Sequence, residues 1–175
     1  MYKTEAIITK VENFKENHLS ISVYSSEYGQ KSLVVFGGKS KKKNSTYVKG
    51  SLNNIEFDNN NVCLSSTSKN TFKWFLFSKY ELKTIDYFCF LINKLLFLAD
   101  QNSNVVSYYL LLISKLNERS NYLPELLLLE LEILKASGYQ PDLNESVLKK
   151  IFNFHDKSNL TVSYTHLRAH ETFAN

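Results

Sequence analysis

The chain has 175 residues, enough for one compact domain or two small ones, and its 43% hydrophobic fraction excludes a chain that is disordered throughout. Its formal net charge of +4 permits binding to a polyanion without requiring it. Two cysteines, Cys63 and Cys89, are too few for a disulfide framework, and the sequence has neither a signal-peptide core nor an uncharged apolar run of about eighteen residues. We therefore expect a cytoplasmic protein with no membrane segment.

The first eighty residues or so have the short-period pattern of β-strands. Residues 19–24 alternate apolar and hydroxyl side chains with period two, as a half-buried strand does. Gly29 and the asparagine run 59–61 mark turns. Strands are predicted at residues 5–11, 19–24, 33–36, 55–57 and 72–77, and residues 62–64 are expected to extend or bulge a strand.

Five short strands in so short a stretch predict a small closed β-barrel. The OB-fold is the usual five-stranded solution, and it binds oligonucleotides on one face and through its loops. The strand pattern alone leaves two alternatives open, an SH3-like barrel and an open meander.

The period changes to three and four residues near residue 80. Asn121 is expected to cap one of the resulting helices, and Gly138 to end it in the left-handed conformation. Helices are predicted at residues 82–99, 105–117, 124–136 and 145–153, the second with Tyr108, Leu111, Leu112 and Leu116 turned inward. The predicted fold class is α+β and multi-domain, with an OB-fold barrel over residues 1–80 and an all-α helical bundle over residues 81–161.

A lysine-rich loop follows the third predicted strand. Four lysines in five positions repel one another, so this loop should be exposed to solvent, where it attracts polyanions such as nucleic acid. Tyr47, close to the lysines and among polar residues, is the preferred ring for base stacking, whereas Phe57 and Trp74 are expected in the core. The predicted phosphate contacts are Lys39, Lys41, Lys42, Lys43 and Lys49, with Lys31 secondary. The alternative is that the lysines only keep the loop soluble.

No arrangement of residues predicts an enzyme or a metal site. The segment Gly37-Gly38-Lys39-Ser40 lacks the spacing of a phosphate-cradling loop, and no Ser, His and Asp set suggests a nucleophile. His166 and His170 do not have the order of a zinc-protease motif. We expect a protein without catalytic centre, metal or cofactor.

Two separate motifs resemble the bacterial recombination mediator RecO family. The first runs from Thr4-Glu5-Ala6-Ile7-Ile8 through Glu27-Tyr28-Gly29-Gln30-Lys31 to Gly37-Gly38-Lys39. The second is the leucine-rich run from Leu129 to Ala136, followed by Ser137-Gly138-Tyr139-Gln140-Pro141-Asp142-Leu143. The resemblance covers residues 3–155.

The resemblance implies an OB-fold followed by a helical domain, with a role in recombinational DNA repair. Proteins of this family bind single- and double-stranded DNA and anneal complementary strands. With RecR they help to load RecA onto DNA coated by single-stranded DNA-binding protein, whose C-terminal tail binds their helical domain. A nucleoid-associated location in the cytoplasm follows from this role.

The sequence departs from the family pattern in two places. Many members have four zinc-binding cysteines after the Pro-Asp-Leu turn, whereas no cysteine follows Cys89 here, so we expect no zinc. Residues 162–175 resemble a translated sequencing-adaptor read-through and are expected to be a non-native tail, which leaves the helical domain incomplete.

Two other functions remain compatible with the residues. One is a helical protein-interaction adaptor whose barrel is purely structural. The other is an RNA-binding OB-fold protein.

Overall fold

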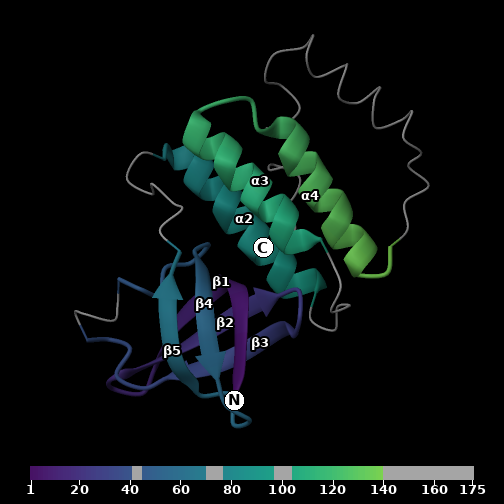
Figure 1. Ribbon diagram of the computed structural model, residues 1–175. Helices are drawn as coiled ribbons and strands as arrows, with labels where there is room; N and C mark the ends of the chain where they lie inside the picture. The colour runs from purple at the N-terminus through teal and green to yellow at the C-terminus, as the bar shows by residue number, and fades with distance from the viewer. Residues whose placement is uncertain (41–44, 70–76, 97–103, 140–175) are drawn as a thin grey trace, which may run out of the picture. The chain divides into compact units, whose positions relative to one another are not determined.

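The computed structural model describes residues 1–40, 45–69, 77–96 and 104–139, in which five strands precede three helices (Figure 1). The strands are β1 (Tyr2–Phe14), β2 (His18–Ser25), β3 (Gly29–Val35), β4 (Leu52–Phe57) and β5 (Cys63–Ser68). The helices are α2 (Lys79–Leu95), α3 (Val105–Glu118) and α4 (Leu123–Ala136). None of the described helices is both long and apolar enough to cross a membrane.

The strands form one antiparallel sheet in the order β3-β2-β1-β4-β5. The long strand β1 pairs with β4 through residues 2–7 and with β2 through residues 7–14. The two edge strands meet at a single parallel bridge between Val34 and Val62, where the Val34 N–H donates to the Asn61 carbonyl at 2.9 Å. Over the described residues the structure therefore shows an open five-stranded sheet with one bridge between its edges, where the sequence predicts a fully closed barrel.

Strand β1 contributes to two separate cores because successive side chains point to opposite faces of a strand. Ala6 and Ile8 belong to a cluster of strand residues and Tyr47 that contains no helix residue. Ile7 belongs instead to a cluster shared with the helices, which also contains Tyr24 and Leu52. This alternation explains why four consecutive residues of β1 are buried.

A β-bulge in β1 points the polar side chain of Thr9 toward helix α2. The register shifts between Ile8 and Lys10, which leaves Thr9 as the extra residue. The Thr9 hydroxyl donates to Oδ1 of Asn93 on α2 at 2.8 Å, and Nδ2 of Asn93 donates back to the Thr9 carbonyl at 3.1 Å. Gln30 donates to the same Asn93 oxygen at 2.9 Å. The bulge thus joins the sheet to α2 by specific hydrogen bonds.

Local sequence signals set the ends of the helices. Ser78 and Glu81 form a capping box at the start of α2, which satisfies two backbone N–H groups that have no partner inside the helix. Gly138 ends α4 at φ +88°, as predicted. Its N–H donates to the Lys135 carbonyl, and the Tyr139 N–H donates to the Leu134 carbonyl, both at 2.9 Å, which is a Schellman motif.

Several element predictions differ from the structure. The fifth described strand lies at Cys63–Ser68. Of the strand predicted at residues 72–77, Phe77 precedes α2, and residues 72–76 lie outside the described part of the chain. Leu111 is 51% exposed because α3 turns Tyr109 and Ile113 inward instead. Asn121 does not occupy the cap position of α4, which is Tyr122, although its side chain accepts from the Leu123 N–H at 3.2 Å. The predicted helix at 145–153 also lies outside the described residues.

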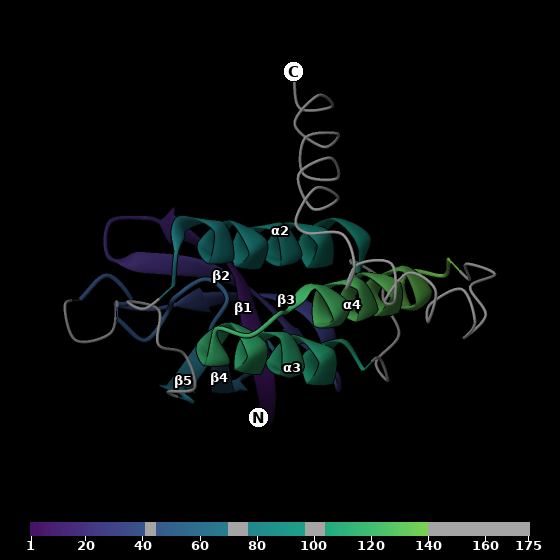
Figure 2. The same cartoon turned by 90° about the horizontal axis from the view of Figure 1, so that it is seen from above.

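The described helices pack together and onto the sheet. Residues Met1–Gln140 form one compact unit, in which α3 and α4 are neighbours (Figures 1 and 2). The change from strand to helix falls between Ser68 and Lys79, close to the predicted boundary at residue 80. The division into domains at 1–80, 81–161 and 162–175 remains a prediction.

Candidate nucleic-acid interface

The turn after β3 holds Lys39 against the hairpin between β1 and β2. The Gly37 N–H donates to Nδ1 of His18 at 3.2 Å, and Nζ of Lys39 donates to the Lys15 carbonyl at 2.8 Å. Gly37 has φ +66°, and a Cβ on Gly38 would lie 3.0 Å from the side chain of Leu19. A side chain at either glycine of the predicted lysine loop would therefore strain this turn.

The other lysines of the predicted loop, Lys41, Lys42 and Lys43, lie outside the described residues. Their predicted role as phosphate contacts rests on the sequence.

Lys31 lies at a distance from Lys39 along the sheet. It is an exposed residue near the start of β3, opposite Val23. Four residue steps of extended chain, about 13 Å, separate it from Val35, where β3 ends. The structure therefore places Lys31 and Lys39 toward opposite ends of one strand.

Lys49 forms an ion pair with a residue of helix α2. Its Nζ lies 2.7 Å from Oδ1 of Asp86, and the neighbouring Gly50 N–H donates to the Ile8 carbonyl at 2.6 Å. An aspartate this close offsets the charge of Lys49, so Lys49 does not extend the surface around Lys39.

Tyr47 is buried, and the expectation of an exposed ring for base stacking is wrong. Its side chain is 8% exposed within the core of the sheet, and its hydroxyl lies 3.8 Å from Sγ of Cys63. Burial, followed by the influence of Cys63, raises the pKa of Tyr47. Phe57 is also in this core, as predicted, and Trp74 lies outside the described residues.

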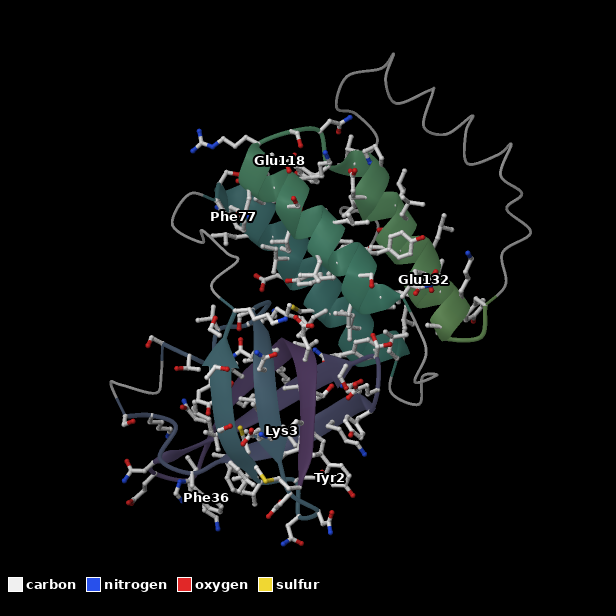
Figure 3. The ribbon with its side chains drawn as sticks, viewed as in Figure 1. Tyr2, Lys3, Phe36, Phe77, Glu118 and Glu132 are labelled. Atoms are coloured by element: carbon white, nitrogen blue, oxygen red, sulfur yellow. The ribbon has the colours of Figure 1, made fainter. Side chains whose placement is uncertain are left out.

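Sequence reasoning missed a group of exposed rings beside Lys39. Phe36 is 53% exposed and Phe14 is 38% exposed (Figure 3 labels Phe36). The ring of His18 meets the ring of Phe36 edge to face, with centroids 4.8 Å apart. The missed signal is the strand alternation: Leu19 and Val35 pair on the inner face, so the adjacent His18 and Phe36 must point outward.

Carboxylates offset the charge of several lysines elsewhere on the sheet. Lys3 lies 2.5 Å from Glu56, and its hydrogen bond lowers the pKa of that carboxyl group. Lys69 binds Glu5 at 2.6 Å, and Lys10 binds Glu12 at 2.8 Å. Within the described residues, Lys15, Lys31 and Lys39 form no such pair. Unpaired positive charge therefore occurs at the hairpin and turn that carry Lys15 and Lys39, and separately at Lys31.

The described part of the chain brings no three His, Cys, Asp or Glu side chains together as a metal site. Both cysteines are buried, and neither forms a disulfide.

Residues 1–85, just under half of the chain, match the family model described as Recombination protein O N terminal. No curated protein matches the chain.

Proposed function

The N-terminal region of this chain, residues 1–85, belongs to the RecO N-terminal domain family, and we propose that the protein is a DNA-binding recombination mediator. Family membership supports a role in DNA recombination and repair. In the proposed mechanism the protein anneals complementary single strands. Together with RecR it helps to load RecA onto DNA coated by single-stranded DNA-binding protein.

The observation that carries the proposal is the family match over the residues that form the sheet. The strand order β3-β2-β1-β4-β5, with a parallel bridge between Val34 and Val62, is compatible with an OB-fold barrel that closes at this bridge. OB-folds bind oligonucleotides through one face and the adjoining loops. The hairpin between β1 and β2 is one such loop, and the Lys39 side chain donates a hydrogen bond to its Lys15 carbonyl.

Positive side chains would hold the sugar–phosphate backbone without reading its sequence. The proposed contacts are Lys39, Lys41, Lys42 and Lys43, with Lys31 and Lys49 as weaker contributors. Neutralising phosphates on two strands lowers their mutual repulsion, so annealing requires binding but no bond-making chemistry. We therefore propose that the protein is not an enzyme and needs no cofactor.

The proposed partners follow from the same role. They are single- and double-stranded DNA, RecR, the C-terminal tail of single-stranded DNA-binding protein, and RecA indirectly. The proposed location is the nucleoid region of the cytoplasm.

A salt titration of oligonucleotide binding tests the proposal. Log affinity for single-stranded DNA should fall linearly with log salt, because bound lysines release condensed counterions. Replacing Lys41, Lys42 and Lys43 together by alanine should reduce the slope by about two to three units. The matched control replaces the exposed lysines of helix α2, Lys79, Lys83 and Lys94, which removes the same charge elsewhere.

The same titration decides between the proposal and its two alternatives. Equal slopes for the triple variant and wild type would remove the lysine loop from the mechanism, and absence of binding would favour a protein-interaction adaptor. Tighter binding to ribose than to deoxyribose oligomers of one sequence would favour an RNA-binding protein.

A further inference from the structure

An ion pair joins helix α2 to the connection between β3 and β4, residues 36–51. Nζ of Lys49 lies 2.7 Å from Oδ1 of Asp86, and the two side chains are 40% and 63% exposed, so a ligand can reach both. Lys49 belongs to the same connection as Lys39 and the other lysines of the predicted loop. Asp86 therefore neutralises a positive charge within the segment that the proposed function assigns to phosphate binding.

The backbone beside Lys49 is held by contacts that do not involve the Lys49 side chain. The Gly50 N–H donates to the Ile8 carbonyl at 2.6 Å. The Gly50 carbonyl accepts from the buried hydroxyl of Tyr109, also at 2.6 Å. The connection is thus tied to β1 and to α3 independently of the ion pair. The Lys49 side chain can leave Asp86 while the backbone stays in place.

The ion pair is weak enough to be exchanged for another. A pair between exposed side chains contributes little to stability, because water solvates both charges and the long lysine side chain loses conformational freedom. A phosphate oxygen is negatively charged, as a carboxylate oxygen is, and it accepts the same charge-assisted hydrogen bond from an ammonium group. A DNA phosphate can therefore replace Asp86 at Lys49, and the free energy lost with the ion pair is subtracted from that of DNA binding.

Other lysine–carboxylate pairs of the protein lie within one kind of element. Lys3 and Glu56 are direct register partners in the neighbouring strands β1 and β4. Lys115 and Glu118 lie one turn apart on α3. The carboxylate that binds Lys49 comes instead from a helix, while Lys49 itself lies on a connection between strands. A change of partner at Lys49 therefore alters a contact between the helices and the sheet region.

We propose that Asp86 competes with a DNA phosphate for Lys49 and thereby lowers the affinity of the protein for DNA. This inference rests on the proposed function and adds a residue that regulates the same site. When a phosphate binds the ammonium group of Lys49, the ion pair between α2 and the connection opens. DNA binding and this ion pair oppose each other, so removal of the carboxylate strengthens binding.

The test compares Asp86→Asn with wild type in salt titrations of fluorescein-labelled oligo(dT), followed by anisotropy. The variant should bind about two- to fivefold more tightly at low salt, because the phosphate no longer has to displace a carboxylate. The slope of log affinity against log salt should steepen by up to about 0.7, the value for one further phosphate contact on a single strand. Glu118→Gln is the matched control, because it removes the same charge from an exposed ion pair on α3 and should bind like wild type (Figure 3 labels Glu118).

Two further variants separate competition at Lys49 from a general effect of charge. In the Lys49→Ala background, Asp86→Asn should no longer strengthen binding, since the ammonium group for which the two anions compete is gone. Asp86→Glu keeps the charge and should bind like wild type. Salt-dependent binding by wild type with no gain in Asp86→Asn, or with an equal gain in Glu118→Gln or in the Lys49→Ala background, would overturn the competition and leave the proposed function intact. No binding by wild type would overturn both.

Discussion

At the residue scale, Tyr109 links helix α3 to the loop before β4 through one buried hydrogen bond. Its side chain is fully buried, and its hydroxyl donates to the Gly50 carbonyl at 2.6 Å. Tyr109→Phe leaves this buried carbonyl without that donor, which should lower the free energy of unfolding by about 1–3 kcal/mol. Urea unfolding measures the change. Tyr108→Phe, which removes a hydroxyl from a half-buried neighbour, should cost less, and equal losses would contradict the assigned role of Tyr109.

A second residue-scale prediction concerns Cys89. Burial raises the pKa of this thiol to about 12, with a smaller raising effect from Asp86 opposed by Lys49. The unfolded chain therefore loses this proton at lower pH than the folded chain. The contribution of the Cys89 thiol to the free energy of unfolding is complete below about pH 9 and is lost as the pH rises toward 12.

The pH dependence of unfolding checks this account of Cys89. In Cys89→Ala, the free energy of unfolding should fall less steeply between about pH 9 and 11, by up to about 1.4 kcal/mol per pH unit. Cys63→Ala provides a comparison at the other buried thiol. An unchanged slope in Cys89→Ala would show that the thiol titrates alike in both states.

At the element scale, helix α4 depends on its C-terminal glycine. Gly138 has φ +88°, and a Cβ there would meet nothing within 4 Å, so the cost of a side chain comes from the backbone alone. Gly138→Ala should destabilise the protein by about 1 kcal/mol, measured by thermal unfolding at 222 nm. Gly138→Asn should cost less because asparagine tolerates the left-handed conformation. Equal costs for alanine and asparagine would contradict the explanation.

The elements also show why sequence patterns succeed in some places and fail in others. The end of α4 could be predicted because glycine at the C′ position acts locally. The fifth strand could not: residues 63–68 are mostly Ser and Thr, and they become a strand by pairing with β4. Propensity favours strands in aromatic runs such as 72–77, whereas at residues 63–68 tertiary pairing makes a strand of residues with weaker propensity.

In the candidate site, too, some features could be predicted from the sequence and others could not. The loop that contains Gly37, Gly38 and Lys39 could be predicted from the sequence. The burial of Tyr47 could not be predicted, because its neighbours in sequence are polar while its neighbours in space are core residues such as Cys63. The exposed rings beside Lys39 were missed because Phe36 lies far from Phe14 and His18 in the sequence, and only the strand register brings them together.

At the scale of the whole molecule, the sheet and the helices share one core. Ile7, Tyr24 and Leu52 of the sheet pack with Phe88 and Leu112 of the helices. Loss of the helices would expose apolar side chains of β1, β2 and β4 to water, at a cost of roughly 25 cal/mol per Å².

This shared core predicts a common unfolding transition. Hydrogen exchange of peptides from β2 and from α3, followed along a urea series, should give the same midpoint. A sample in saturating urea gives the exchange of the fully unfolded chain as the reference. Unfolding of α3 at clearly lower urea than β2 would contradict the shared core and would favour independent domains divided near residue 80.

The measurement that tests the central proposal most directly is the annealing rate of two complementary oligonucleotides. One strand carries a donor dye and the other an acceptor, and energy transfer follows duplex formation with and without the protein. We expect the wild-type chain to accelerate annealing at low salt, and to lose this effect as salt rises or when Lys41, Lys42 and Lys43 are replaced. An annealing rate equal to the spontaneous rate, at protein concentrations that saturate the strands, would contradict the proposed function.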